Sequence, residues 1–336
     1  MSAFSAKATI TDNGAVLLGK YVACDAFEKF RPLRVVTHAH ADHMMGLRQS
    51  LAACEKVLMT SATKDLIDVM MGPLFLMGGY VETLEYNKTV RYMEETVTFF
   101  PADHILGAAQ VLVEDAEGTK IAYTGDFRIE ETPVLEVDVL VIEATYGSPS
   151  CRRPFEDVKE LLVSIVEEGL KHGPVHVFGY HGKLQEVMQI LRSAGVTAPF
   201  LVPQKVFQVS KVCEKYDMRF GRLLLRLEEK EAKELLEKRG PCVTFYHMGS
   251  RGKVSHDSLR VYLSGWEFNS PCREIAENEY IIALSDHSDF DGLMEYVRLS
   301  RPKLVITDNF RVGYAETLAK EIRKHFNIPA LPLPKR

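Results

Sequence analysis

The sequence Thr37-His38-Ala39-His40-Ala41-Asp42-His43 carries four side chains within six residues that can bind a metal ion. It directly follows the β-branched pair Val35 and Val36, so these side chains are expected where a strand passes into a loop. Imidazole and carboxylate groups suit zinc and related divalent ions, and such an edge lets neighbouring side chains converge. A lone histidine is usually structural, but four ligands at this spacing predict a metal site.

Two later segments supply matching partners. His104 follows the strand-like run 97–100, and Asp126 follows the strand-like run 121–124 and a glycine. Alone, an acid after a glycine is an ordinary turn residue. With the histidines it provides a carboxylate able to bridge two ions, which at about 3.5–4 Å apart can activate water and neutralise a phosphoryl group. One predicted ion is held by His38, His40, His104 and Asp126, and a second site begins with Asp42, His43 and Asp126.

These residues resemble the metal motifs of the metallo-β-lactamase superfamily, and later segments resemble its nucleic-acid-cutting branch, the β-CASP nucleases. A strand at 139–142 ends in Glu143, and Ser285-Asp286-His287 is similar to the later histidine motif of that branch. Between them, the segment 179–186, which includes Gly182 and Lys183, is similar to a helix start inside β-CASP domains. The resemblance runs from about residue 10 to 325. It is greatest to DNA-ligase-associated exonucleases and to mRNA 3′-end-processing-factor-like proteins.

The resemblance implies an α/β fold: a metallo-β-lactamase αββα sandwich with an inserted α/β β-CASP domain, whose parallel sheet is flanked by helices. A Ser/Pro/Arg-rich segment at 148–154 marks a boundary, and from Tyr280 the pattern is read as that of the first domain again. We therefore predict a discontinuous metallo-β-lactamase domain, 1–147 and 274–336, and a β-CASP insertion at 148–273. Helices are expected at 61–71, 155–170, 183–193 and 314–325, and a hairpin at 111–124.

The resemblance also implies catalytic roles. Asp42, besides binding metal, would orient the attacking water, and His287 would give a proton to the leaving oxygen. Glu143 would hydrogen-bond His287 and fix its tautomer. The alternative reading makes Glu143 a loop acid and His287 a capping residue.

Four residues are predicted to bind substrate phosphates. Gly182 and Lys183 stand at a helix start, where backbone amides attract anions. Arg251 and Lys253 lie in a glycine-rich segment and are candidates for backbone phosphates, with contacts that would position a nucleic acid without reading its sequence.

One position departs from the family pattern. RNA-cutting members have a further histidine after the last strand, which binds the second metal, whereas the DNA-cutting cross-link and hairpin nucleases have a valine. In this chain the strand 303–307 runs into Asp308 and Asn309, and the register leaves open which of them takes that place. Asp308 is the predicted direct ligand, whereas Asn309 would act weakly or through water. The motif therefore does not separate RNA from DNA substrates.

Composition and net charge restrict the partners and the cellular compartment expected for this protein. The net charge is −5, so attraction to a polyanion has to come from local charge, including that of the metal ions. The six cysteines are scattered and never spaced as Cys-x-x-Cys, which argues against a disulfide framework and suits the cytoplasm. The apolar stretch 66–81 contains Asp68 and Pro73 and falls short of the roughly 20 residues that span a bilayer, so no membrane association is expected.

The predicted function is metal-dependent hydrolysis of phosphodiester bonds in single-stranded DNA or RNA by a metal-activated water. Two divalent ions are expected, zinc or else manganese. A DNA exonuclease in repair is preferred on likeness alone. The alternatives are an RNA-processing nuclease of the mRNA 3′-end type, a catalytically weak nucleic-acid-binding subunit, and a small-molecule hydrolase, which would not require residues 148–273. A homodimer and membership of a repair or processing complex stay open.

Overall fold

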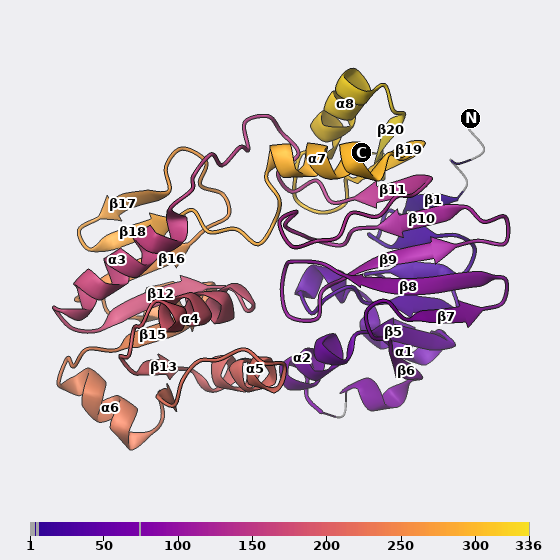
Figure 1. Cartoon of the computed structure of the whole chain (residues 1–336). Coiled ribbons are helices and arrows are strands. Elements are labelled where there is room, and N and C mark those ends of the chain that lie inside the picture. The colour runs from indigo at the N-terminus through magenta and orange to yellow at the C-terminus, as the bar shows by residue number, and fades with distance from the viewer. Residues whose placement is uncertain (1–3, 5–6, 74, 336) are drawn as a thin grey trace. The chain divides into compact units, whose positions relative to one another are not determined.

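Two face-to-face sheets build the first of two compact units, which comprises Met1–Arg152 and His287–Arg336. The structure is a computed structural model that describes residues 4, 7–73 and 75–335 (Figure 1). One sheet has the strand order β1 (Ala8–Ile10), β2 (Val16–Leu18), β3 (Val22–Cys24), β4 (Leu33–Val35), β5 (Lys56–Met59) and β6 (Val81–Thr83). The other has the order β20 (Ala330–Leu333), β19 (Leu304–Asp308), β11 (Val139–Ile142), β10 (Lys120–Tyr123), β9 (Ala109–Glu114), β8 (Glu95–Pro101) and β7 (Thr89–Tyr92).

The core of this unit lies between its two sheets. Successive side chains of a strand point to opposite faces, and in β8 the buried residues alternate accordingly, with Val97 and Phe99 inward. They belong to one apolar cluster with residues of both sheets, such as Val35 from β4 and Val111 from β9. Burial of each such side chain stabilises the folded state by about 1.5–3 kcal/mol. This burial holds the two sheets together.

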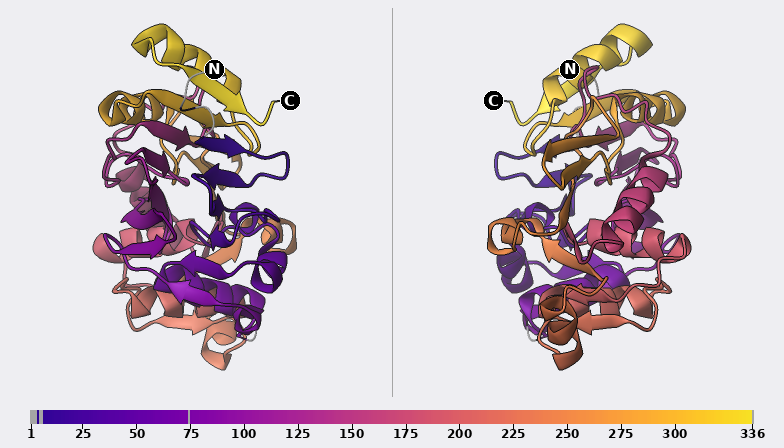
Figure 2. Two further views of the ribbon diagram at one scale, coloured as in Figure 1. Left: turned by 90° about the vertical axis from the view of Figure 1, so that its right-hand side faces the viewer. Right: turned by 90° about the vertical axis from the view of Figure 1, so that its left-hand side faces the viewer.

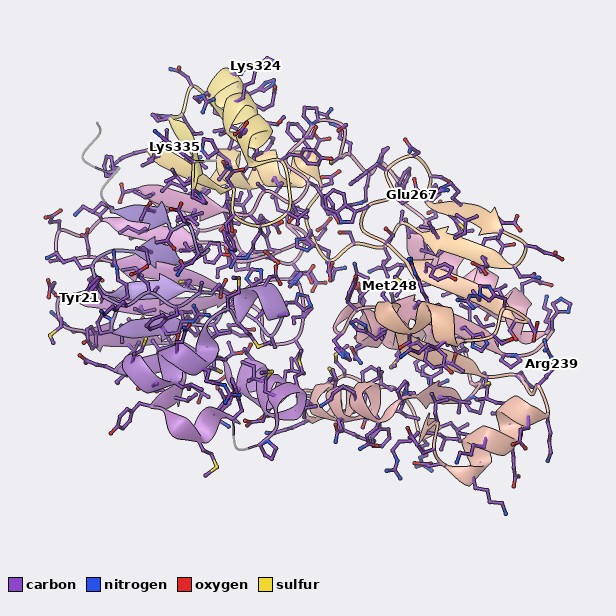
Figure 3. All side chains as sticks on the ribbon, turned by 180° about the vertical axis from the view of Figure 1, so that it is seen from behind. Tyr21, Arg239, Met248, Glu267, Lys324 and Lys335 are labelled. Carbon is purple, nitrogen blue, oxygen red and sulfur yellow. The ribbon has the colours of Figure 1, made fainter. Side chains whose placement is uncertain are left out.

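Helices cover the outer faces of both sheets. On the first sheet lie α1 (Leu47–Ala53), α2 (Ser61–Met71) and the short η3 (Phe75–Gly78). The helices α7 (Phe290–Ser300) and α8 (Ala315–Phe326) lie together on the second sheet (Figure 2). Labelled Lys324 points outward from α8 (Figure 3). This arrangement confirms the predicted αββα sandwich.

A single mixed sheet forms the second unit, Arg153–Asp286. Its order is β14 (Leu224–Arg226), β13 (Phe200–Val202), β15 (Val243–His247), β12 (Val175–Gly179), β16 (Leu259–Leu263), β18 (Glu279–Ile282) and β17 (Cys272–Ala276). All neighbours are parallel except the edge pair β17–β18. Its helices are α3 (Val158–Leu170), α4 (Lys183–Ser193), α5 (Gln204–Lys215) and α6 (Lys230–Glu237), with the short η4 (Met248–Lys253) after β15. The predicted parallel sheet with helices is thus confirmed.

The return of the chain to the first unit differs from the sequence interpretation. The sequence predicts that residues from 274 onward belong to the first domain, whereas β17 and β18 pair with the sheet of the second unit. The reason is that β18 pairs in parallel with β16, from Arg260 opposite Glu279 to Leu263 opposite Ile282. The contacts change unit after Arg152 and after Asp286, while 147/148 and 273/274 stay sequence predictions of the domain boundaries.

No helix within the described residues has the length and apolar character needed to cross a membrane. Residue 74, part of the apolar stretch 66–81, lies outside the described residues.

Candidate metal centre

The candidate ligands lie at strand ends on one edge of the two sheets. The first motif follows β4 and continues into the short helix η2 (Ala41–His43). Asp126 follows β10 and Glu143 follows β11, and these two strands are parallel neighbours. Because parallel strands end at the same edge of a sheet, residues that follow them come close together. His104 joins them from the connection between β8 and β9.

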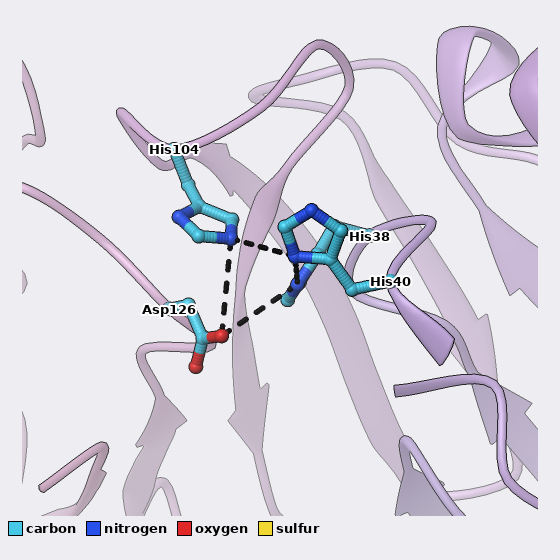
Figure 4. A group of neighbouring side chains, drawn as sticks. All are labelled: His38, His40, His104 and Asp126. Carbon is cyan, nitrogen blue, oxygen red and sulfur yellow. Dashed lines mark hydrogen bonds and ion pairs between the residues drawn. The ribbon is translucent and has the colours of Figure 1, made fainter. Parts of the chain in front are cut away.

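Three histidine nitrogens and one carboxylate oxygen converge at this edge (Figure 4). His40 Nδ1 lies 3.1 Å from His38 Nε2 and 3.1 Å from His104 Nε2. Asp126 Oδ2 lies 3.6 Å from His38 Nε2 and 3.8 Å from His104 Nε2. One proton on His40 Nδ1 can serve only one of its two imidazole neighbours, whereas a metal ion accepts lone pairs from all three rings. The donor set therefore fits zinc or a similar ion.

Electrostatic interactions keep two of these groups in the protonation states that bind metal. Burial, together with His43, His104 and His40, lowers the pKa of His38 well below its usual range, so the ring is neutral. Burial alone would raise the pKa of Asp126, but neighbouring histidines, chiefly His43 and then His287, hold it well below the usual range. A neutral imidazole and an ionised carboxylate are the protonation states that bind metal.

A second group of side chains meets the same carboxylate. His43 Nε2 lies 3.1 Å from Asp126 Oδ2 and 3.5 Å from Asp42 Oδ2. By hydrogen-bond geometry, this buried nitrogen has no partner among the described residues. Burial would lower the pKa of His43, but Asp126 and Asp25 outweigh burial and Arg311 and raise it to about 10. An ion bound at His43 must therefore displace a proton.

Asp25, which the sequence interpretation missed, supports both histidine groups from behind. Its carboxylate lies 2.7 Å from His43 Nδ1 and accepts the backbone N–H of Thr37 at 2.9 Å and the Thr37 hydroxyl at 2.8 Å. The Thr37 hydroxyl in turn lies 3.1 Å from His38 Nδ1. Asp25 is fully buried and adopts a left-handed φ of 63°, which is rare outside glycine. An acid directly after β3 was the signal, but its value depends on the parallel pairing of β3 with β4.

Asp25→Asn is expected to lower zinc affinity by about 10–100-fold, because partners that orient metal-binding histidines have effects of that size. Zinc competition with a chromogenic chelator measures the change. Asp12→Asn, on the exposed surface, is the matched control. Equal zinc affinity in wild type and Asp25→Asn would show that the carboxylate does not orient these ligands.

The predicted proton donor lies beside this centre. His287 Nδ1 is 2.9 Å and 3.1 Å from the two carboxylate oxygens of Glu143. One of these oxygens also accepts the backbone N–H of Phe127 at 2.8 Å, so Glu143 is fixed in place. The ring centroids of His287 and His104 are 4.8 Å apart. The structure thus brings the predicted pair together next to the histidine cluster.

Asp308 and Asn309, the alternatives for the last ligand, have other partners. Asp308 closes β19 and accepts Nη1 of Arg311 at 2.6 Å, with both side chains almost fully buried. The Asn309 side-chain amide donates to the carbonyl of Pro334 at 3.0 Å. A ligand role for Asp308 stays a prediction, and any ion there has to compete with Arg311.

The predicted phosphate-binding residues lie in the second unit. Gly182 has φ 89° before α4, and its N–H donates to the Gln185 side chain at 2.9 Å. Lys183 is ion-paired with Asp286 at 2.9 Å, and their side chains are only 7% and 9% exposed. Lys183 is thus committed to a buried pair, whereas Arg251 and Lys253 are exposed on η4.

Comparisons with known proteins identify the family, although no family model matches the chain. It is 42% identical over 138 residues to an uncharacterized protein in the lig 3′ region of Acidianus ambivalens, covering 40% of this chain and 99% of that one. It is 27% identical over 285 residues to cleavage and polyadenylation specificity factor subunit 3 of Dictyostelium discoideum, covering 70% of this chain and 36% of that one. An RNase J-like protein of Methanocaldococcus jannaschii is 31% identical over 184 residues, covering 47% of this chain and 43% of that one. The chain therefore spans less than half of the last two relatives.

A two-sheet sandwich with helices outside and a histidine–aspartate centre at its strand ends defines a metallohydrolase of the metallo-β-lactamase type. The chain belongs to the β-CASP nuclease branch of that superfamily, as its sequence motifs predicted.

Proposed function

We propose that this protein is a metal-dependent nuclease that hydrolyses phosphodiester bonds of single-stranded nucleic acid. The observation that carries the proposal is the His287–Glu143 pair beside a histidine–aspartate cluster. A metal site alone would serve many hydrolases, but a positioned proton donor suits a leaving alkoxide oxygen. The names of the Methanocaldococcus and Dictyostelium relatives, an RNase J-like protein and a cleavage factor subunit, support the same chemistry.

The metal would be held by His38, His40, His104 and Asp126, and their nitrogen and oxygen donors favour zinc, with manganese as the alternative. When bound, a divalent ion lowers the pKa of water to produce the nucleophile and neutralises charge on the phosphoryl group. The predicted second ion would use Asp42, His43 and Asp126. Zinc as the metal and the number of ions are part of this proposal.

The proposed roles of the other residues follow from their positions. Asp42 has a side chain that is 60% exposed, so it can accept a hydrogen bond from the attacking water and orient it. Glu143 accepts the proton of His287 Nδ1, which leaves Nε2 of that ring to carry the proton for the leaving oxygen.

The polymer is proposed to be DNA, in an exonuclease role in repair, on the sequence resemblance to DNA-ligase-associated exonucleases. The words "lig 3′ region" in the name of the Acidianus relative, which is 42% identical, support this choice. RNA is the alternative, favoured by the names of the Dictyostelium and Methanocaldococcus relatives. A homodimer and a repair or processing complex are compatible with either. All six cysteines are free thiols, which supports the proposed cytoplasmic location.

Cleavage of matched single-stranded DNA and RNA, labelled at the 5′ or 3′ end, tests the proposal with Zn²⁺ or Mn²⁺ present. Cleavage that is lost in Asp42→Ala and His287→Ala is expected, and the label pattern gives the direction of digestion. A zinc-loaded wild type that cleaves neither polymer would contradict the proposal and favour a nucleic-acid-binding subunit or a small-molecule hydrolase.

The β-CASP insertion, predicted at 148–273, is proposed to contribute phosphate contacts through Arg251 and Lys253. Replacing both by alanine is expected to weaken binding of single strands of any sequence. The slope of log K against log salt should become shallower by about 1.4, or about 0.7 for each lost contact. Filter binding from low to moderate salt measures this, with Lys230→Ala plus Lys233→Ala on α6 as the charge-matched control. An unchanged slope would exclude phosphate contacts by this pair.

A further inference from the structure

A buried arginine lies on the Asp42–His43 side of the centre. Arg311 Nη1 donates to Asp308 Oδ2 at 2.6 Å, and Nη2 donates to the backbone carbonyl of Asp42 at 3.3 Å. The side chain of Arg311 is only 9% exposed and that of Asp308 only 1%. The guanidinium therefore links the end of β19 to η2, which carries two of the residues predicted to bind the second ion.

The groups around Arg311 stabilise the positive charge of its guanidinium. Burial alone would lower the pKa of the guanidinium, but the acidic groups around it outweigh burial and raise it well above its usual range. The carboxylates among these groups are Asp308, Asp25 and Asp126. Among the described residues, Arg311 Nε and the Tyr123 hydroxyl are buried without a hydrogen-bond partner. The ion pair with the buried carboxylate of Asp308 compensates the charge of Arg311.

This charge acts on the groups that a second ion would need. The guanidinium of Arg311 donates to the carboxylate of Asp308 and to the backbone carbonyl of Asp42, two positions that the sequence assigns to the second ion. Arginine stays protonated in proteins and has no lone pair to offer a metal, unlike histidine. It also engages Asp308, the candidate carboxylate at the end of β19.

We infer that Arg311 supplies positive charge at the second metal position, so that the centre holds one divalent ion tightly and binds the predicted second ion only weakly. The inference rests on the metal centre proposed above. A fixed positive charge in contact with Asp308 and the Asp42 backbone repels an incoming dication, and in a buried setting this repulsion is poorly screened. The same charge lowers the electrostatic cost of gathering several carboxylates at one edge, and with the single ion it provides the positive field for a phosphoryl group.

Metal stoichiometry tests the inference without relying on activity. Wild type, Arg311→Met and Arg311→Lys are dialysed to equilibrium at the same buffered free zinc concentrations, and zinc per chain is measured by mass spectrometry. Wild type and Arg311→Lys are expected to bind one zinc ion tightly. Arg311→Met, which frees Asp308 and removes the charge, is expected to bind a second ion more than about tenfold more tightly than wild type does. Arg298→Met, an exposed arginine paired with Glu295, is the control and should match wild type.

Cobalt substitution provides an independent readout, because two neighbouring Co²⁺ ions couple magnetically and one ion does not. We expect no magnetic coupling between cobalt ions in wild type, and magnetic coupling in Arg311→Met. Two tightly bound ions in wild type would overturn the inference, and this arm does not depend on the variants being folded. Equal stoichiometry in wild type and a folded Arg311→Met would overturn it as well. Wild type that binds no zinc would contradict the metal centre itself, a result distinct from the binding of two ions.

Discussion

Asp126→Asn is expected to release the metal and abolish cleavage. Asp126 Oδ2 lies within 3.8 Å of nitrogens from three histidines, His38, His43 and His104. An amide is a far poorer ligand than a carboxylate and leaves the histidine cluster without its negative charge. Loss of a group that only orients a ligand already costs about 10–100-fold in metal affinity, so loss of this ligand should exceed about 100-fold.

Zinc content after dialysis and cleavage of labelled strands measure the two effects in the same protein sample. Asp291→Asn is the control, because Asp291 is an exposed acid of the same unit, paired with Arg152. Thermal unfolding of the metal-free proteins separates a lost ligand from a lost fold. Wild-type zinc content in Asp126→Asn would contradict the placement of the ion at this carboxylate.

His287→Ala is expected to lower kcat by about 10²–10⁴-fold while zinc content stays at the wild-type level. The proposed proton donor acts on the leaving oxygen, so its loss should matter only where that oxygen needs a proton. With bis(p-nitrophenyl) phosphate, whose leaving group departs as a stable anion, the deficit should shrink to less than about tenfold. Glu143→Gln should show the same pattern in weaker form, because it leaves the ring without its orienting carboxylate.

The comparison between the two substrates distinguishes this role from a structural one. His172→Ala, on an exposed ring of the second unit, is the matched control. A deficit of equal size on both substrates would mean that His287 maintains the site without donating a proton. Loss of zinc from His287→Ala would make the residue a metal ligand.

Local motifs made the ligand set visible in the sequence. His38, His40, Asp42 and His43 sit within one short segment, and His104, Asp126 and Glu143 each follow a strand, so each was recognisable where it stood. The helices were equally accessible where apolar residues recur at helical spacing, and α2 spans Ser61–Met71 as expected. The polar turn between β9 and β10 predicted the hairpin that these strands form.

Features that depend on the pairing of distant strands could not be predicted from the sequence. Asp25 matters because β3 pairs with β4, and β17–β18 join the second unit because β18 pairs with β16. No local sequence pattern near these residues predicts either strand pairing. At the end of β19, the sequence predicts a ligand at Asp308 or Asn309 and gives no sign of a role for Arg311, because a cation is not expected among metal ligands. The helix α5 was missed although its buried residues Val206, Val209 and Cys213 recur at helical spacing.

The candidate ligands come from both sheets of the first unit, and this has a consequence for how the fold is maintained. His38, His40 and His43 follow a strand of one sheet, whereas His104 and Asp126 belong to connections of the other. A bound ion therefore acts as a crosslink across the sandwich, and only the folded chain can assemble it. At free metal a thousand times its Kd, such a ligand adds about 4 kcal/mol to the free energy of unfolding. Metal supply in the cell would then set the abundance of the folded protein as well as its activity.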